Sequence, residues 1–95
     1  MKTCTVVATF TPNPQNFVEV KELLLDVAKD VRLELGCLFY DLYEELSGKL
    51  IFIEAWESRE LWQIHNDAPT VERIVEFIAG KLSEPVVVQE MYAAN

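Results

Sequence analysis

A chain of 95 residues makes one small domain, which buries only roughly two-thirds of its unfolded surface on folding. The composition is globular, with 51% hydrophobic and 25% charged residues, and the net charge of −8 reflects eight basic against sixteen acidic residues. Because the sequence has no cluster of Lys or Arg, we expect neither a nucleic acid nor an anionic membrane surface as its partner.

Targeting and membrane-spanning signals are not evident in the sequence. The opening residues MKTCTVV lack the apolar core and the cleavage site of a signal peptide, and no apolar run approaches the roughly 20 residues of a membrane span. Cys4 and Cys37 are too few for a disulfide framework or a zinc site, which predicts two free, buried thiols and no metal. We therefore expect a cytoplasmic protein.

The first third of the chain predicts a strand followed by a helix. Alternating residues over Thr3–Phe10 favour the strand, and the prolines of the following TPNPQN segment end it. Either Asn13 or Asn16 can cap the helix, which runs to about Leu35 and ends at Gly36. Its apolar stripe has helical spacing: Phe17, Val20, Leu23, Leu24, Val27, Ala28, Val31 and Leu35.

Two further strands are predicted to form an antiparallel hairpin. They cover Cys37–Glu45 and residues 50–57, with a turn between them. If the loop spans Ser47–Lys49, the register pairs Leu46 with Leu50, Tyr40 with Trp56 and Leu42 with Glu54. A slip of one residue would move these pairs to opposite faces of the sheet.

The last third predicts two helices and a closing strand. Ser58 is a good N-cap for a short helix, on which His65 lies on the apolar side with Leu61 and Ile64, while Trp62 is predicted at the surface or the rim. Residues 66–69 break this helix and Pro69 starts the next one. Its stripe is Val71, Ile74, Val75, Ile78 and Leu82, and Pro85 opens the final strand.

The predicted order is β-α-β followed by β-α-α-β, which indicates an α+β, ferredoxin-like split βαβ sandwich over residues 1–95. Such a fold is a four-stranded antiparallel sheet with its helices on one face. The third strand is apolar on both faces, whereas an open sheet with a wet face alternates more cleanly. An exposed apolar face predicts a partner, and the simplest is a second copy, giving a homodimer through the sheet face.

The chain resembles the antibiotic biosynthesis monooxygenase (ABM) superfamily over nearly its whole length. The strongest marker is Glu54-x-Trp56-x-Ser58 with His65 nine residues after the tryptophan. The second is Gly36-Cys37 with Tyr40 three residues on. The resemblance implies ferredoxin-like chains that pair into a dimeric α/β barrel, a fold that hosts several chemistries.

Many members of that superfamily oxidise quinols or polycyclic aromatics with dioxygen and without metal or flavin. On this resemblance, His65 is the candidate base or hydrogen-bond partner, because neutral imidazole accepts a proton near pH 7. Trp56 would be a wall for a planar ring, and Tyr40 would orient a substrate oxygen. Glu54 would fix the tautomer of the histidine or contact the substrate, and Phe52 would complete the binding surface.

Two departures from the superfamily pattern narrow this expectation. Many relatives carry a second histidine five residues after the first, where this chain has Thr70. The haem-degrading branch uses an asparagine near the position of Thr9 and a histidine later than His65, and this chain has neither. The resemblance therefore does not extend to haem binding.

The sequence also allows two other classes of function. Related small proteins isomerise phosphorylated signalling sugars, a reaction for which the region offers only Arg59 and Arg73 as phosphate ligands. A non-catalytic, ligand-binding or stress-associated dimer is a third class. The candidate residues also have structural interpretations: His65, Trp56 and Tyr40 as packed side chains, and Glu54 as a hydrogen-bond partner of a helix end.

Overall fold

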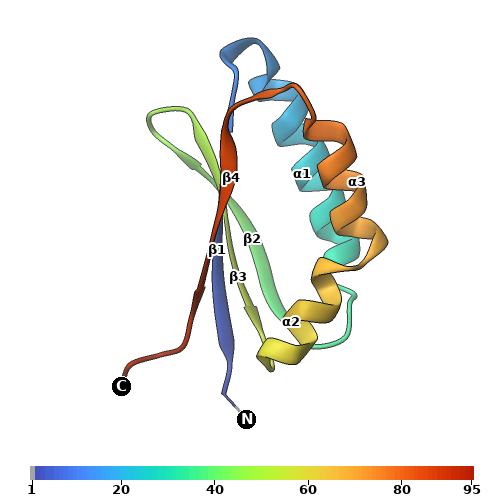
Figure 1. Cartoon of the computed structure of the whole chain (residues 1–95), viewed down its shortest axis with the longest axis vertical. Coiled ribbons are helices and arrows are strands. Elements are labelled where there is room, and N and C mark those ends of the chain that lie inside the picture. Colours follow the sequence, from blue (N-terminus) through green and yellow to red (C-terminus); the bar gives the residue numbers. More distant parts are fainter. Residues whose placement is uncertain (1) are drawn as a thin grey trace.

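The computed structural model describes residues 2–95, so Met1 of the predicted domain lies outside the described residues. A four-stranded antiparallel sheet has the order β2-β3-β1-β4, and α1 and α3 cover one of its faces (Figure 1). The elements are β1 (Cys4–Pro12), a 3-10 turn η1 (Pro14–Asn16), α1 (Phe17–Val31), β2 (Cys37–Glu45), β3 (Lys49–Trp56), α2 (Arg59–Asn66), α3 (Pro69–Ile78) and β4 (Leu82–Met91). This is the predicted α+β ferredoxin-like arrangement.

The core lies between the sheet and the helices. Alternate residues of β1 are buried, and they lie opposite buried residues of β3 at pairs such as Ala8 and Phe52. The buried stripe of α1 packs on this face, in which Leu24 and Val27 are fully buried. The buried face of β1, which repeats every two residues, therefore packs against the buried face of α1, which repeats every 3.6 residues.

The first helix ends four residues before the predicted boundary, at Val31. The chain then turns through hydrogen bonds such as Leu33 N to Asp30 O and Glu34 N to Val31 O, and Leu35 is 80% exposed rather than part of the stripe. Gly36 has a φ of +85°, and a Cβ atom there would lie 2.5 Å from the Leu61 side chain. The turn therefore requires glycine at residue 36, where the backbone packs against Leu61 of α2 just before β2 begins.

The hairpin register differs from the predicted one by two residues. Tyr40 lies opposite Glu54, and Glu45 lies opposite Lys49, so the loop is residues 46–48. The physical reason is Gly48, which has a φ of +104° and donates its N–H to Glu45 O, as in a three-residue hairpin loop that ends in a left-handed residue. Because the shift is even, the predicted faces of the strands are unchanged.

Four predictions for the last third were wrong. Trp62 is 7% exposed, whereas Ile64, predicted on the apolar side of the same helix, is 65% exposed. Val75 of the predicted α3 stripe is also 59% exposed. The final strand begins at Leu82 rather than at Pro85, because residues 82–84 pair with the end of β1 and a proline is tolerated in this edge strand.

The face of the sheet that the helices leave open is apolar, as the sequence predicted from its two-sided apolar strands. It combines half-buried residues of β1 and β3 with exposed residues of β2 and β4: Val7, Ile51, Ile53, Phe39, Tyr43, Val87 and Met91. We call these seven residues the open face. Within residues 2–95 no helix is long and apolar enough to cross a membrane.

Candidate functional site

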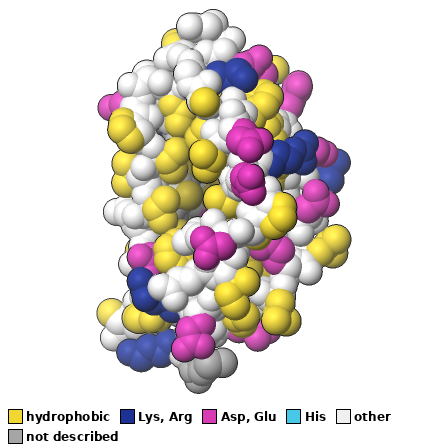
Figure 2. Space-filling view, turned by 45° about the vertical axis from the view of Figure 1, so that its right-hand side comes forward, with side chains coloured by type: hydrophobic (Ala, Val, Ile, Leu, Met, Phe, Trp, Pro, Cys, Tyr) yellow, Lys and Arg dark blue, Asp and Glu magenta, His cyan; other side chains and the backbone are white. Residues whose placement is uncertain are grey.

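An apolar cavity of about 250 Å³ lies between the sheet and the helices α2 and α3. Hydrophobic side chains gather around a hollow on this side of the molecule (Figure 2). The apolar wall comes from β1, α3 and β4: Val6, Ala8, Phe10, Val71, Ile74, Val75, Ile78, Val86 and Val88. The remaining lining residues are Tyr40, Glu54, Trp62, His65 and Asn66. Apolar walls with a few converging polar groups are typical of a small-molecule site.

Glu54 brings a carboxyl group to this wall from near the end of β3. It is 3% exposed, and its Oε1 accepts a hydrogen bond of 2.9 Å from Trp56 Nε1. Burial raises the pKa of Glu54 to about 7, against the lowering effect of the Trp56 hydrogen bond. A carboxyl group with this pKa is partly protonated at neutral pH, so it can both accept and donate a proton.

His65 reaches the same cavity from the last turn of α2 and is 4% exposed. Its ring stacks on Trp56, with the ring centroids 4.6 Å apart, and meets the edge of Tyr40 at 5.6 Å. Its Nδ1 lies 2.9 Å from Oε1 of Glu34. Burial lowers the pKa of His65, although the Glu34 carboxylate acts in the opposite direction, so the imidazole is neutral at pH 7.

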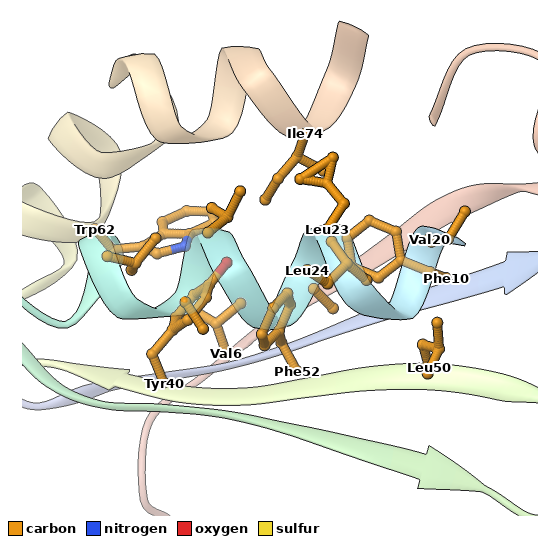
Figure 3. Close-up of a cluster of buried hydrophobic side chains, with 14 of the residues drawn as sticks. Val6, Phe10, Val20, Leu23, Leu24, Tyr40, Leu50, Phe52, Trp62 and Ile74 are labelled. Carbon is orange, nitrogen blue, oxygen red and sulfur yellow. The ribbon is translucent and has the colours of Figure 1, made fainter. Parts of the chain in front are cut away.

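Tyr40 rises from β2 and is 2% exposed. Its ring packs against Phe52 with a centroid distance of 4.2 Å, and its hydroxyl points from the sheet toward the helices, as Figure 3 shows. Burial strongly raises the pKa of Tyr40, with a further contribution from the Glu54 and Glu34 carboxylates. The hydroxyl therefore stays protonated and acts as a hydrogen-bond donor rather than as a base.

The structure brings Tyr40, Glu54 and His65 together on the cavity wall, but it places Trp56 and Phe52 behind that wall. Trp56 and Phe52 are fully buried and are not among the lining residues. A ligand ring in the cavity would meet the imidazole before it met the Trp56 indole. Trp56 instead supports the two acid–base groups, by stacking on one and by donating a hydrogen bond to the other.

Sequence reasoning missed two parts of the site. Trp62 lines the cavity, and its position three residues before His65 would have placed it on the same helix face. Glu34, rather than Glu54, contacts His65, and its second oxygen accepts a hydrogen bond of 2.6 Å from the Thr70 hydroxyl. No periodicity points to Glu34, because it lies in the turn after α1.

The described residues contain no group of three or more His, Cys, Asp or Glu side chains that could hold a metal ion. Both cysteines are free, as predicted, although only Cys4 is buried and Cys37 is half-buried. Burial raises the pKa of Cys37 to about 11, so its thiol is protonated at neutral pH. The polar groups on the cavity wall offer proton transfer at His65 and Glu54 and hydrogen bonding from Tyr40.

The comparisons with known proteins agree with this arrangement. The sequence model of the antibiotic biosynthesis monooxygenases matches residues 3–76. Rv0793 from Mycobacterium tuberculosis, which carries the provisional name of a monooxygenase, is 32% identical over 84 residues, which are 87% of this chain and 83% of that protein. Its structure matches 98% of this chain and 96% of its own with a TM-score of 0.91 and 29% identity.

Two other solved structures are similar over their full lengths. One is described as an antibiotic biosynthesis monooxygenase and has 28% identity and a TM-score of 0.89, covering 97% of this chain and 99% of its own. PA3566 from Pseudomonas aeruginosa has a TM-score of 0.90 at 24% identity, covering 100% and 97%, and shows a likeness of fold alone. The chain belongs to the antibiotic biosynthesis monooxygenase family.

Proposed function

We propose that this protein is a cofactor-independent monooxygenase that oxidises a small quinol or a similar hydroxylated aromatic with dioxygen. The observation that carries the proposal is an apolar cavity with two acid–base groups, His65 and Glu54, on its wall. Family membership supports oxygenase chemistry at the coarse level. The protein would supply a dry pocket and a base, while the substrate itself would supply the electrons.

The size of the cavity favours a substrate of one or two fused rings. An apolar protein cavity of about 150 Å³ accommodates benzene, and this cavity measures about 250 Å³. Drug-sized ligands occupy pockets of about 300 Å³ or more. The larger polycyclic aromatics are therefore poorer candidates than a two-ring quinol.

The proposed reaction begins when His65 or Glu54 removes the proton of an aromatic hydroxyl. The resulting anion is electron-rich and transfers an electron to dioxygen, and recombination of the two radicals forms a carbon–oxygen bond at a ring C–H position. Loss of water from this peroxide leaves a quinone. One oxygen atom becomes a carbonyl, and the other leaves as water with the two hydrogens of the O–H and C–H bonds, so no external reductant is required.

The main alternative, isomerisation of a phosphorylated sugar, receives less support from the cavity. Its lining includes no Lys or Arg side chain, whereas phosphate recognition relies on basic groups or backbone donors. Glu54, the one carboxyl group on the wall, would repel a phosphate. A non-catalytic ligand-binding dimer is the outcome that remains if aromatic compounds bind without turnover.

We also propose that the protein is a homodimer through the open face. Exposed fractions of 42% for Phe39, 53% for Tyr43 and 54% for Val87 leave a broad apolar surface on an isolated chain. A two-fold axis through this face would bury the same residues on both copies. Sedimentation at micromolar concentration tests this, because a monomer there would contradict the proposal.

Oxygen-electrode measurements over a panel of one- and two-ring quinols, with metals chelated, test the proposed reaction. Replacing a general base lowers the rate by about 100-fold to 10,000-fold. We expect a loss of this size in His65→Ala or in Glu54→Gln, and the variant that loses it identifies the base. Uptake no faster than autoxidation with every substrate would refute the proposal. A matched control is Glu60→Gln, which removes one exposed carboxylate from α2.

A further inference from the structure

We infer that Glu34 and Thr70 position His65 as a proton acceptor facing the cavity and carry its proton to solvent. This inference rests on the proposed function for the identity of the proton donor, but its structural content concerns the histidine alone. The three residues come from the turn after α1, from α2 and from α3. Their contact therefore depends on the packing of both α2 and α3 beside that turn.

The hydrogen bonds define one arrangement of donors and acceptors. Thr70 Oγ1 donates to Oε2 of Glu34 at 2.6 Å, and Oε1 of the same carboxylate lies 2.9 Å from His65 Nδ1. An ionised carboxylate only accepts hydrogen bonds, so the proton between Glu34 and His65 belongs to Nδ1. The neutral imidazole then has its lone pair on Nε2, which is the nitrogen left for a ligand in the cavity.

The orientation of the imidazole is fixed by its other neighbours. One ring face stacks on Trp56 at an interplanar angle of 27°, and Tyr40 meets it edge-on. These contacts limit rotation of the ring, while the Glu34 carboxylate sets its tautomer. This is the relation of an orienting carboxylate to a histidine base, in which the carboxylate also stabilises the imidazolium.

The side chains of His65 and Glu34 differ in their exposure to solvent. The His65 side chain is 4% exposed, whereas the Glu34 side chain is 21% exposed. A proton accepted at Nε2 makes the ring positive, and the proton at Nδ1 can then pass to Glu34 and from there to bulk water. The proton therefore leaves from the Nδ1 side of the imidazole and not from Nε2, the nitrogen assigned to the ligand. Return of the Nε2 proton to the oxygen that leaves as water, with uptake of a proton at Nδ1 through Glu34, restores the starting tautomer.

The charges that face His65 support this direction of transfer. Glu34 raises the pKa of the ring, against the lowering by burial. Glu54 from β3 and Tyr40 from β2 lie on the same cavity wall, and Cys37 lies near both carboxylates with a protonated thiol. Glu34 is therefore the one carboxylate in hydrogen-bond contact with the imidazole among the described residues.

The sole histidine of the chain makes the test direct. Nitrogen NMR of the imidazole reports its tautomer and its pKa without reference to turnover. We expect the Nδ1–H tautomer in the wild-type protein and a lower His65 pKa in Glu34→Gln than in the wild type, because the opposite charge is lost. Thr70→Val should weaken the preference for this tautomer, and Thr70→Ser should restore it. Glu60→Gln should leave both readings unchanged.

The outcomes separate this inference from the proposed function. An Nε2–H tautomer in the wild type, or a pKa unchanged in Glu34→Gln, overturns the positioning role even if dioxygen uptake is observed. The expected tautomer and pKa change without any dioxygen uptake would support the positioning role and refute the monooxygenase. If both hold, the acidic limb of the kcat/KM profile should move to lower pH in Glu34→Gln, which a merely structural role would not cause.

Discussion

Replacing Glu54 by Gln should reduce the loss of stability that the wild-type protein shows as the pH rises from about 5 to about 8. Gln keeps the shape of the side chain and an oxygen that can accept the Trp56 N–H, but it cannot ionise. In the wild-type protein, ionisation of Glu54 must occur at a site that is 3% exposed. The substitution therefore removes the cost of a buried charge and preserves the packing.

The sign and size follow from the pKa. Burial raises the folded-state pKa of Glu54 from 4.5 to about 7, so the folded protein holds this proton more tightly than the unfolded chain. The stability that this group contributes is present below the unfolded pKa and is lost as the pH rises through about 7. At about 1.4 kcal/mol for each pH unit, this loss between about pH 5 and about pH 8 is about 2.5 kcal/mol.

Urea denaturation of both proteins at these two pH values measures the effect. Each pair is compared at one protein concentration, because association would contribute to stability. Titration of His65 acts with the opposite sign, since its pKa is lowered on folding, but it is common to both proteins and largely cancels. An equal change in the free energy of unfolding between the two pH values for wild type and variant would refute the buried-carboxyl argument.

Four further changes have defined outcomes. Trp62→Ala should lower the free energy of unfolding by about 3 to 5 kcal/mol in chemical denaturation, because it removes a buried indole, and an unchanged midpoint would contradict its burial. Gly36→Ala should lower the melting temperature, and adding Leu61→Ala should not restore it, since the Cβ atom of residue 61 would still lie 2.9 Å from the new Cβ and the positive φ remains. Ala8→Phe should abolish binding of aromatic ligands in calorimetry by filling the cavity, with a folded circular-dichroism spectrum. Ile53→Lys should give a monomer in sedimentation if the open face forms the dimer.

Local periodicity was sufficient to predict the sheet and the helices. The alternation in β1 and the stripe of α1 each identify a buried face without reference to the rest of the chain. Two of the errors fell where one glycine decides the path of the backbone. Gly48 set the hairpin register and Gly36 closed the turn after a shortened α1, and in both cases the required φ depends on tertiary context.

The candidate site was predictable in part for a similar reason. Tyr40, Glu54 and His65 lie on elements whose inward faces can be read from spacing, and all three reach the cavity. Glu34 is 31 residues from His65 in the sequence and lies in an irregular turn, so only the packing of α2 against that turn brings them together. Trp56 was expected at the ligand, but its neighbour His65 covers it.

Isotopically labelled dioxygen tests the central claim most directly. A two-ring hydroxyarene would be turned over under labelled dioxygen with metals chelated, and the product would be trapped by reductive acetylation before its carbonyl oxygens exchange with water. Mass spectrometry should find one labelled atom in each quinone, and none in a reaction with the inactive variant after correction for autoxidation. A quinone without label, formed with hydrogen peroxide, would show that the protein removes electrons without inserting oxygen and would contradict the monooxygenase account.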